Sequence, residues 1–394
     1  MKAFLEALEQ FAVEVILDRR KGRRAAFLKG FLYLLSLLYR QIVVLRLRFF
    51  EWRFARVHAL GCLVISVGNL TVGGTGKTPI VEKLARRLTD SGRRVAILSR
   101  GYKSVPVPFW QRMRDRFRSR EHATPPRVVS DGKRLLLDSA RAGDEPYMLA
   151  KNLKDVVVVV DRDRVKGGLH AIRRFGVDTL LLDDGFQYLP LKERCDVLLV
   201  DRESPFGNRH LLPRGMLREP QGHLKRADFI FLTKCDGSDL SPLKEELRRF
   251  NRHAPIVECV HRPQFLENLH TGERQPLEFL RGLRVGAFSG IARPESFEDG
   301  LRRLGAEICY SRHFADHHRF DGEEVANALS RSKARTARAV ITTEKDAVRI
   351  PPIAEPPLPV YFLRVEIEVL HNEEALEALF ESWLHKKEEA PAAA

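Results

Sequence analysis

The chain has few cysteines, and no two of them stand at a spacing that would hold a metal ion or form a redox-active pair. The 394 residues contain five cysteines, and each is isolated in the sequence. Single, scattered cysteines indicate reduced thiols in a cytosolic setting and exclude the disulfide framework of a small secreted protein. The five are Cys62, Cys195, Cys235, Cys259 and Cys309.

Long hydrophobic runs are also missing. The longest uncharged run near the N-terminus covers residues 30–39 and ends at Arg40, whereas a membrane-spanning helix needs about 20 apolar residues. No cleavage pattern of a secretory signal is present. We therefore expect neither a membrane-spanning segment nor a signal peptide.

The same region still has the composition of an amphipathic helix. Residues 27–54 are rich in leucine, aromatic residues and arginine, and their apolar residues recur at helical spacing. A basic helix of this kind either lies in a membrane interface or packs on the core of the first domain, and one helix can do both. The apolar positions are Leu28, Leu32, Leu35, Tyr39, Ile42 and Leu45.

Acidic residues are too few to balance the basic ones. There are 52 acidic and 67 basic side chains, which gives a formal net charge of +15. Such an excess favours anionic partners, namely nucleic acid, anionic lipid or a phosphorylated substrate. The positive charge is dispersed and matches no nucleic-acid-binding module, so we expect no nucleic-acid partner. Nothing in the sequence predicts a protein partner.

A glycine-rich turn between an apolar run and a helical pattern is the most informative feature. Residues 63–67 predict a strand, residues 80–88 predict a helix, and the turn between them ends in Gly76-Lys77-Thr78. This is the setting of a phosphate-binding loop, in which Lys77 reaches the phosphates and the Thr78 hydroxyl binds Mg²⁺. The predicted nucleotide-binding residues of the loop are Gly73, Gly74, Thr75, Gly76, Lys77 and Thr78.

Alternating strand and helix patterns predict the fold class. Five consecutive valines, residues 156–160, indicate a strand buried on both faces of a parallel sheet. We therefore expect an α/β fold, a P-loop NTPase-like, doubly wound, mostly parallel sheet. Loop and turn signals at residues 262–282 precede a smaller second α/β domain. The predicted boundaries are a helical N-terminal region at 1–56, a P-loop domain at 57–265, the smaller domain at 266–385 and a disordered tail at 386–394.

Two acidic sites stand at the ends of predicted elements. Asp183 and Asp184 end an apolar strand, where a carboxylate that binds Mg²⁺ belongs. The alternative for this acidic pair is a helix N-cap. Asp144 opens a predicted helix, so on its own it reads as a helix cap.

Two further polar segments are candidates for chemistry. In Asp316-His317-His318, a histidine beside an acid suits proton transfer better than a metal site. Arg218 could neutralise phosphate oxygens and Glu219 could complete Mg²⁺ coordination, the alternative being a surface salt bridge.

Two other segments remain open. Thr233-Lys-Cys-Asp236 resembles weakly the guanine-reading sequence of GTP-binding proteins, so a P-loop GTPase switch is the alternative function. Residues 104–126 combine prolines, aromatic residues and basic side chains. They indicate a solvated surface insertion, and their arginines and aromatic rings make contact with lipid the alternative.

Taken together, the motifs resemble the tetraacyldisaccharide 4′-kinase family, the lipid A 4′-kinases of Gram-negative bacteria. The carrying segments span about residues 30–370, in the order of the family, and the threonine at loop position 71 is typical of it. They are residues 66–78, Ser99-Arg-Gly-Tyr102, Gly143-Asp-Glu-Pro146, Asp183-Asp-Gly-Phe-Gln187, residues 212–219, Phe314-Ala-Asp-His-His318 and Thr342-Thr-Glu-Lys-Asp-Ala347.

The resemblance implies a kinase that moves the γ-phosphate of ATP to the 4′-hydroxyl of a tetraacylated glucosamine disaccharide 1-phosphate. It implies a peripheral protein at the cytoplasmic face of the inner membrane, with the N-terminal helix on the membrane surface. Asp144 would act as general base, assisted by His317. Residues serving ATP and Mg²⁺ would be Lys77, Thr78, Asp183, Asp184, Gln187, Arg218 and Glu219.

The chain departs from the family pattern at two places. Tyr188 follows the Asp-Gly-Phe-Gln turn where the family has histidine, so no proton-transfer role carries over to that position. The insertion at 104–126 is longer than the loop of the family, and the resemblance assigns it no role.

Overall fold

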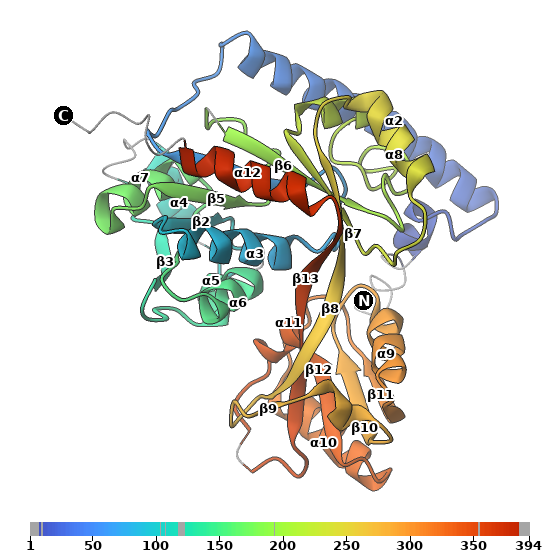
Figure 1. The fold of residues 1–394 in the computed structure, drawn as a ribbon. Helices are drawn as coiled ribbons and strands as arrows, with labels where there is room; N and C mark the ends of the chain where they lie inside the picture. The colour runs from blue at the N-terminus through green and yellow to red at the C-terminus, as the bar shows by residue number, and fades with distance from the viewer. Residues whose placement is uncertain are drawn as a thin grey trace.

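One mixed sheet runs through the whole protein and joins two lobes (Figure 1). The computed structural model describes residues 8, 11–102, 104–106, 108–116, 123–192, 194–353 and 355–385. The tail predicted at 386–394 lies outside these residues. The strand order is β11-β10-β12-β13-β8-β7-β6-β1-β5-β2-β4-β3, with β9 paired to β8.

Among the described residues, the first lobe contains seven strands of the sheet, β1 to β7. Its strands pair in parallel except at the edge, where β3 runs antiparallel to β4. The valine run becomes β4 and is buried, as expected for a strand covered on both faces. The strands are β1 (Leu63–Asn69), β2 (Val95–Ser99), β3 (Arg127–Asp131), β4 (Val157–Val160), β5 (Thr179–Asp183), β6 (Arg194–Asp201) and β7 (Phe229–Thr233).

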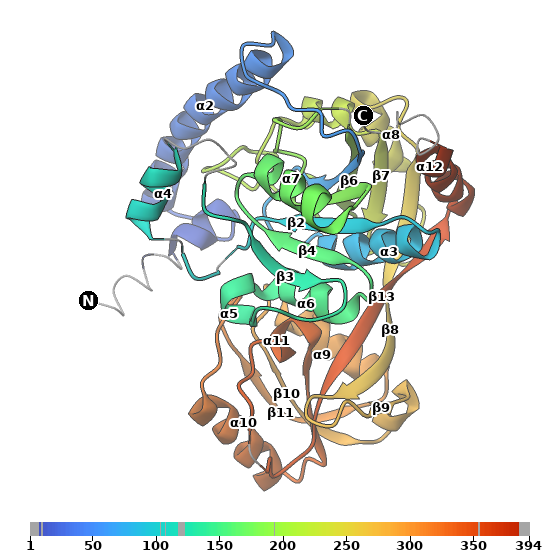
Figure 2. The same cartoon turned by 90° about the vertical axis from the view of Figure 1, so that its left-hand side faces the viewer.

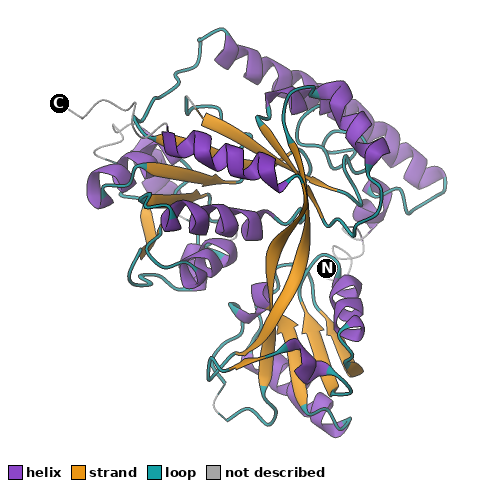
Figure 3. Ribbon diagram, in the orientation of Figure 1, coloured by secondary structure: helices purple, strands orange, loops and turns teal. Residues whose placement is uncertain are grey.

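Helices cover both faces of this lobe (Figures 1 and 3). Ile65 and Leu181 point to the face covered by α3, α6 and α12, while their neighbours Val64 and Leu180 point to the face covered by α7. This alternation gives two cores, one on each side of the sheet, and confirms the predicted doubly wound α/β fold. The helices are α3 (Lys77–Asp90), α5 (Ser139–Ala142), α6 (Asp144–Asn152), α7 (Arg164–Phe175), η1 (Gln221–Arg226), α8 (Ser241–Phe250) and α12 (Glu373–His385).

A long antiparallel pair, β8 (Ile256–Asn268) and β13 (Val360–His371), connects the lobes (Figure 1). The expectation of loops and turns at 262–282 is therefore wrong for its first part. Pro263 disguises the strand, but it lies beyond the pairing of β8 with β7, where a strand tolerates a missing N–H group. The second lobe contains β9 (Arg274–Gln275), η2 (Leu277–Leu280), β10 (Arg284–Ser289), α9 (Pro294–Arg303), β11 (Glu307–His313), α10 (Gly322–Ala334), β12 (Ala339–Thr343) and α11 (Glu344–Ala347).

The last helix returns to the first lobe. Leu376, Phe380 and Trp383 of α12 belong to the same core as α3 and the first half of β8. The predicted boundary near residue 265 falls inside β8. The division of the chain at the predicted residue numbers stays a prediction.

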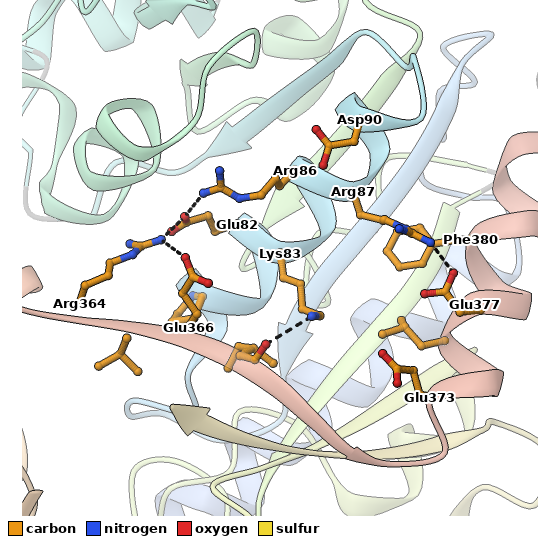
Figure 4. Close-up of a pocket in the computed structure, with 14 residues that line it drawn as sticks. Glu82, Lys83, Arg86, Arg87, Asp90, Arg364, Glu366, Glu373, Glu377 and Phe380 are labelled. Carbon is orange, nitrogen blue, oxygen red and sulfur yellow. Dashed lines mark hydrogen bonds and ion pairs between the residues drawn. The ribbon is translucent and has the colours of Figure 1, made fainter. Parts of the chain in front are cut away.

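A cluster of charged side chains joins α3 to the connecting strands (Figure 4). Arg364 of β13 forms ion pairs with Glu82 of α3 and, at 2.7 Å, with Glu344 of α11. All three side chains are largely buried, so solvent screens the two ion pairs only weakly. Helix α3, which follows the phosphate loop, is thereby linked through Arg364 to α11 of the second lobe.

Helix α2 (Arg23–Glu51) lies along the outside of the first lobe (Figure 1). By length and composition alone it is sufficient to cross a membrane, so the expectation that this segment is too short is wrong. The expectation considered only the uncharged run, whereas the 29 residues of α2 extend about 43 Å at 1.5 Å per residue. Of the predicted stripe, Leu28, Leu32, Leu35 and Tyr39 are half-buried against the protein. The last two members, Ile42 and Leu45, are exposed, so the predicted stripe is wrong for them.

A second apolar stripe of α2 points outward. Its members recur at helical spacing and are exposed, so the helix is apolar on both its inner and its outer side. They are Phe27, Phe31, Leu34, Leu38, Ile42, Leu45 and Phe49.

Candidate active site

The glycine-rich turn leads from β1 directly into α3, as the sequence predicts. Gly76 adopts a left-handed conformation (φ 79°), and a Cβ atom there would clash with the His261 ring. A side chain is therefore excluded on two counts at the start of the helix. Lys77 Nζ lies 3.1 Å from Asn69 Oδ1 and 3.1 Å from Asp184 Oδ1, so its ammonium group is held at the turn.

The two adjacent aspartates at the end of β5 have different surroundings. Asp183 is buried and accepts a hydrogen bond from Ser99 Oγ at 3.1 Å. Its burial, together with the charges of Glu145 and Asp184, raises the pKa of Asp183 to about 7. Asp184 is also desolvated, but the charges of Lys77 and Arg218 outweigh this and lower its pKa to about 2.

Arg218 and Gln187 extend this cluster toward α2. Arg218 Nη1 donates to Asp184 Oδ2 at 2.7 Å, and the Gln187 amide donates to the Asn69 carbonyl at 3.0 Å. Helix α2 touches both residues, because Tyr39 donates to the Arg218 carbonyl at 3.0 Å and Arg46 to the Gln187 carbonyl at 3.1 Å. The outer helix therefore contacts the backbone of the predicted nucleotide site.

Glu219 is engaged elsewhere. Its carboxylate lies 2.6 Å from His223 Nδ1 and 3.0 Å from Arg226 Nη2, and it is buried. Burial acts to raise the pKa of Glu219, but His223 and Arg226 outweigh it and lower the pKa. This predicted metal ligand already has two charged or polar partners.

Asp144 is the centre of a second cluster, between the lobes. The N-cap of α6 is Gly143, so the Asp144 side chain does not cap the helix. Its carboxylate lies 2.8 Å from Arg349 Nε and 3.1 Å from His317 Nδ1, both from the second lobe. Burial acts to raise the pKa of Asp144, but the hydrogen bond with His317 and the charge of Arg349 lower it. The carboxylate is therefore ionised at neutral pH.

The neighbours of His317 divide the Asp-His-His segment. His317 contacts Asp144 directly, and Lys345 Nζ lies 3.1 Å from its Nε2 atom and 3.7 Å from Asp316 Oδ1. His318 instead pairs with Glu324 at 2.7 Å and stacks on Phe314. Asp316 is exposed.

One short turn links the two clusters. Ser99 is bonded to Asp183, and three residues later the Tyr102 ring packs edge-on against His317, with the ring centroids 5.5 Å apart. Glu145, the neighbour of Asp144, is close enough to raise the pKa of Asp183. The phosphate loop and the Asp144 cluster are thus parts of one site.

Several buried polar atoms at the loop lack a partner within the described part of the chain. They are Asp183 Oδ1, Thr75 Oγ1 and Asn69 Nδ2. A buried carboxylate oxygen that lacks a partner is a donor that suits Mg²⁺, which binds few protein oxygens and keeps waters and phosphates as its other ligands. The residues present therefore fit a magnesium nucleotide.

Comparisons with known proteins cover nearly the whole chain. The family model described as tetraacyldisaccharide-1-P 4′-kinase matches residues 28–385. A protein of Geobacter sulfurreducens named tetraacyldisaccharide 4′-kinase is 40% identical over 351 residues, which is 89% of this chain and 92% of the relative. A protein of the same name from Syntrophus aciditrophicus is 39% identical over 343 residues, 85% of this chain and 87% of the relative.

A solved structure agrees with these matches. The crystal structure of LpxK from Aquifex aeolicus, in complex with ATP, superposes with a TM-score of 0.69 at 31% identity. It covers 90% of this chain and 99% of the other. This chain belongs to the tetraacyldisaccharide 4′-kinase family. The predicted family is confirmed, and so is the prediction of an ATP-dependent kinase. The alternative of a GTPase switch is therefore rejected.

The segment proposed for guanine reading has a structural place in this kinase-family fold. Thr233 is buried and its hydroxyl donates to the Thr75 carbonyl at 3.0 Å, which supports the phosphate loop. Asp236 is exposed and pairs with Arg202 at 2.6 Å.

Tyr188, which departs from the family pattern, forms hydrogen bonds at the start of α7. Its hydroxyl donates to Asp163 Oδ1 at 3.0 Å and accepts from the Val165 amide at 3.3 Å, at the start of α7. Burial and the charge of Asp163 raise the pKa of Tyr188 to about 12, so the phenol stays neutral.

Sequence reasoning missed the cations of the Asp144 cluster, among them Arg349 and Lys345. Arg349 is fully buried and also pairs with Asp346 at 3.0 Å, and Lys345 contacts His317. Lys345 and Asp346 belong to the Thr-Thr-Glu-Lys-Asp-Ala segment quoted for the resemblance, and Arg349 follows three residues after Asp346. That segment was the signal, but its partner Asp144 is 205 residues from Arg349 along the chain.

Proposed function

We propose that this protein transfers the γ-phosphoryl group of ATP to the 4′-hydroxyl of a tetraacylated glucosamine disaccharide 1-phosphate. The observation that carries the proposal is the turn from Ser99 to Tyr102. It connects the carboxylate at the phosphate loop to the histidine beside Asp144. A kinase requires both parts, one to hold the donor and one to receive the acceptor hydroxyl.

On the donor side, the loop residues 73–78 cradle the phosphates, and Lys77 and Arg218 carry the positive charge. Both cations now pair with Asp184, and phosphate oxygens would compete for them. We assign Mg²⁺ to Thr78 and Asp183, with Asp184 beside them; when bound, it would neutralise charge on the phosphates. Glu219 is not assigned to the metal, because His223 and Arg226 already occupy its carboxylate.

On the acceptor side, Asp144 is the general base. The acceptor oxygen forms a bond to the γ-phosphorus, the bond from that phosphorus to the β–γ bridging oxygen breaks, and ADP leaves. The hydroxyl proton passes to the Asp144 carboxylate. His317 and Arg349 hold that carboxylate in position from the second lobe, so the base is complete only when both lobes contribute.

The outer stripe of α2 supports a peripheral position on a membrane. The helix could cross a bilayer by length and composition. However, Tyr39 and Arg46 hold it against the first lobe, and a spanning helix would lose these contacts. We propose that α2 lies in the interface of the inner membrane on the cytoplasmic side, where the glycolipid acceptor resides.

The test uses the purified full chain with ATP, Mg²⁺ and the tetraacylated disaccharide 1-phosphate in detergent. We expect a product with one added phosphate, which phosphorus NMR would locate at the 4′-position. The Lys77→Met variant is the control for contaminating kinases and should give no product. If the wild-type chain forms no 4′-phosphate while an authentic kinase of the family does so alongside, the proposal is rejected.

A further inference from the structure

The exposed apolar side chains are confined to a small part of the chain. Among the described residues, large apolar side chains that are exposed lie only in the stretches 8–57, 102–113 and 135–136. None lies within the described residues between 137 and 385. Clustered exposed apolar side chains mark interaction sites. Because the rest of the described surface has only Leu135 and Leu136, the first two stretches are candidates for such sites.

The second stretch contains helix α4 (Phe109–Arg116), part of the insertion that the family resemblance leaves unassigned. Phe109 and Met113, one helical turn apart, are exposed together with Trp110, which is 81% exposed. The sequence of α4 also contains three arginines against one aspartate. Aromatic residues next to arginines are the composition of a helix in a membrane interface.

Contacts fix the far end of α4 to the first lobe. Asp115 accepts a hydrogen bond from the Thr124 amide at 3.1 Å, and Lys166 of α7 donates to the Thr124 carbonyl at 2.9 Å. The helix is therefore attached to the protein while its apolar side chains are left uncovered.

Figure 2 shows where α4 stands relative to α2. Both helices lie on the upper-left side of that view, and both lobes lie on the other side of them. In this view the two helices therefore lie on the same side of the molecule.

We propose that α4 is a second lipid-binding element, and that it forms one membrane-facing surface with the outer stripe of α2. The occupant is an anionic bilayer. Its lipid tails would take up Phe109, Trp110 and Met113, and its phosphate groups would pair with the exposed Arg114. The proposal extends the membrane position given to α2 under the proposed function, and it does not depend on which acceptor is phosphorylated.

The two lipid-binding elements contact the two halves of the site. Helix α2 contacts Arg218 and Gln187 on the donor side. The segment that enters α4 begins at Tyr102, which packs on His317 on the acceptor side. A bilayer held against both helices would therefore lie next to a site whose acceptor is a membrane lipid.

The test measures the depth of Trp110 in vesicles. The chain has three tryptophans, and Trp383 is fully buried, so Trp52→Phe leaves Trp110 as the one exposed indole. With vesicles that contain 30% phosphatidylglycerol and brominated lipids, we expect the emission of this variant to be quenched by at least a third. Quenching should be lost in Trp52→Phe/Trp110→Phe. Full sedimentation with the vesicles without quenching of Trp110 would overturn the proposal.

Partitioning of variants gives the second measurement. Phe109→Ser/Trp110→Ser/Met113→Ser should bind the same vesicles about tenfold or more weakly. Leu135→Ser/Leu136→Ser, which removes exposed leucines outside both helices, should bind like the wild type. Wild-type binding by the α4 variant would overturn the proposal and point to a protein as occupant. The vesicle assay contains neither ATP nor acceptor, so its failure leaves the proposed kinase reaction to its own test.

Discussion

Asp144 and Asp183 are both buried carboxylates of the first lobe, yet their surroundings shift their pKa values in opposite directions. Asp144 has a buried guanidinium and an imidazole against it, and its pKa is lowered. Asp183 has a serine hydroxyl and two nearby carboxylates, and its pKa rises to about 7. The protein itself supplies the cations of the first site, whereas the second is left short of positive charge.

This difference separates two uses of one functional group. A carboxylate already paired with protein cations is held ionised and in place, as a proton acceptor requires. A carboxylate whose negative charge is uncompensated is prepared for a cation that arrives with the substrate. The predictions below test this contrast.

The largest effect is expected for Asp144→Asn, which keeps the size of the side chain but removes the proton acceptor. We expect kcat to fall by about 10²–10⁴ while the affinity for ATP stays unchanged. Steady-state kinetics and ATP titration measure the two quantities, and a melting curve monitors the fold. Asp299→Asn, at an exposed aspartate of α9 in the second lobe, is the control and should retain activity. Equal loss of turnover and ATP binding would mean that Asp144 has a structural role.

Arg349→Met tests whether the pairing at Asp144 is energetically important. The guanidinium is fully buried between Asp144 and Asp346, so its removal leaves two buried carboxylates without a main partner. We expect the free energy of unfolding to fall by about 3–5 kcal/mol, measured by urea denaturation. Arg319→Met removes a partly exposed cation 3.5 Å from the same carboxylate and should cost less than about 1 kcal/mol. Similar losses of unfolding free energy in both variants would contradict the idea that the buried Arg349 is the main partner of Asp144.

Asp183→Asn tests the other carboxylate through pH. The folded pKa of about 7 exceeds the ordinary 3.8, so the folded state binds the proton more tightly between these values. Asp183 should therefore make the stability of the wild type fall as pH rises from about 4 to 7, and Asp183→Asn should make this fall smaller. At pH 8, without nucleotide or metal, we expect the variant to be more stable by on the order of 4 kcal/mol.

Urea denaturation at a series of pH values measures this slope. Asp90→Asn, at an exposed aspartate of the neighbouring α3, should keep the slope of the wild type. If the free energy of unfolding depends on pH in Asp183→Asn as it does in the wild type, another group causes this dependence.

The smallest effect is expected for Tyr39→Phe, which removes the hydrogen bond from α2 to the Arg218 carbonyl. The loss of one such bond costs about 1 kcal/mol, so the KM for ATP should rise about two- to fivefold with kcat nearly unchanged. Tyr33→Phe on the same helix is the matched control, because the ring of Tyr33 makes its contact with His210. Identical kinetics of Tyr39→Phe and the wild type would mean that α2 does not influence the donor side.

The parts of the fold and of the site that depend on one continuous segment could be predicted from the sequence. The phosphate loop and the valine strand are continuous segments whose chemistry is local, so their patterns were sufficient. Strand β8 could not be predicted, because Pro263 and its charged neighbours mask a strand that is stabilised by pairing with the distant β13. The inner stripe of α2 could be predicted, but the uncharged run alone underestimated its length.

Contacts between distant segments limited the prediction of the site. His317 and Asp144 are 173 residues apart, and only the resemblance to the family joined them. Arg349 could not be assigned, since an isolated arginine after a helix has no local pattern that marks it as a partner of Asp144. Glu219 shows the opposite case: its sequence position suggested a metal ligand, but His223, four residues later, is its nearest partner.

The return of α12 to the first lobe has a consequence for synthesis on the ribosome. Trp383 and Phe380 complete a core whose members in α3 were made about 300 residues before. That half of the protein therefore keeps an uncovered apolar surface until α12 has been synthesised. A nascent chain released before α12 is made would expose this surface to chaperones or to aggregation.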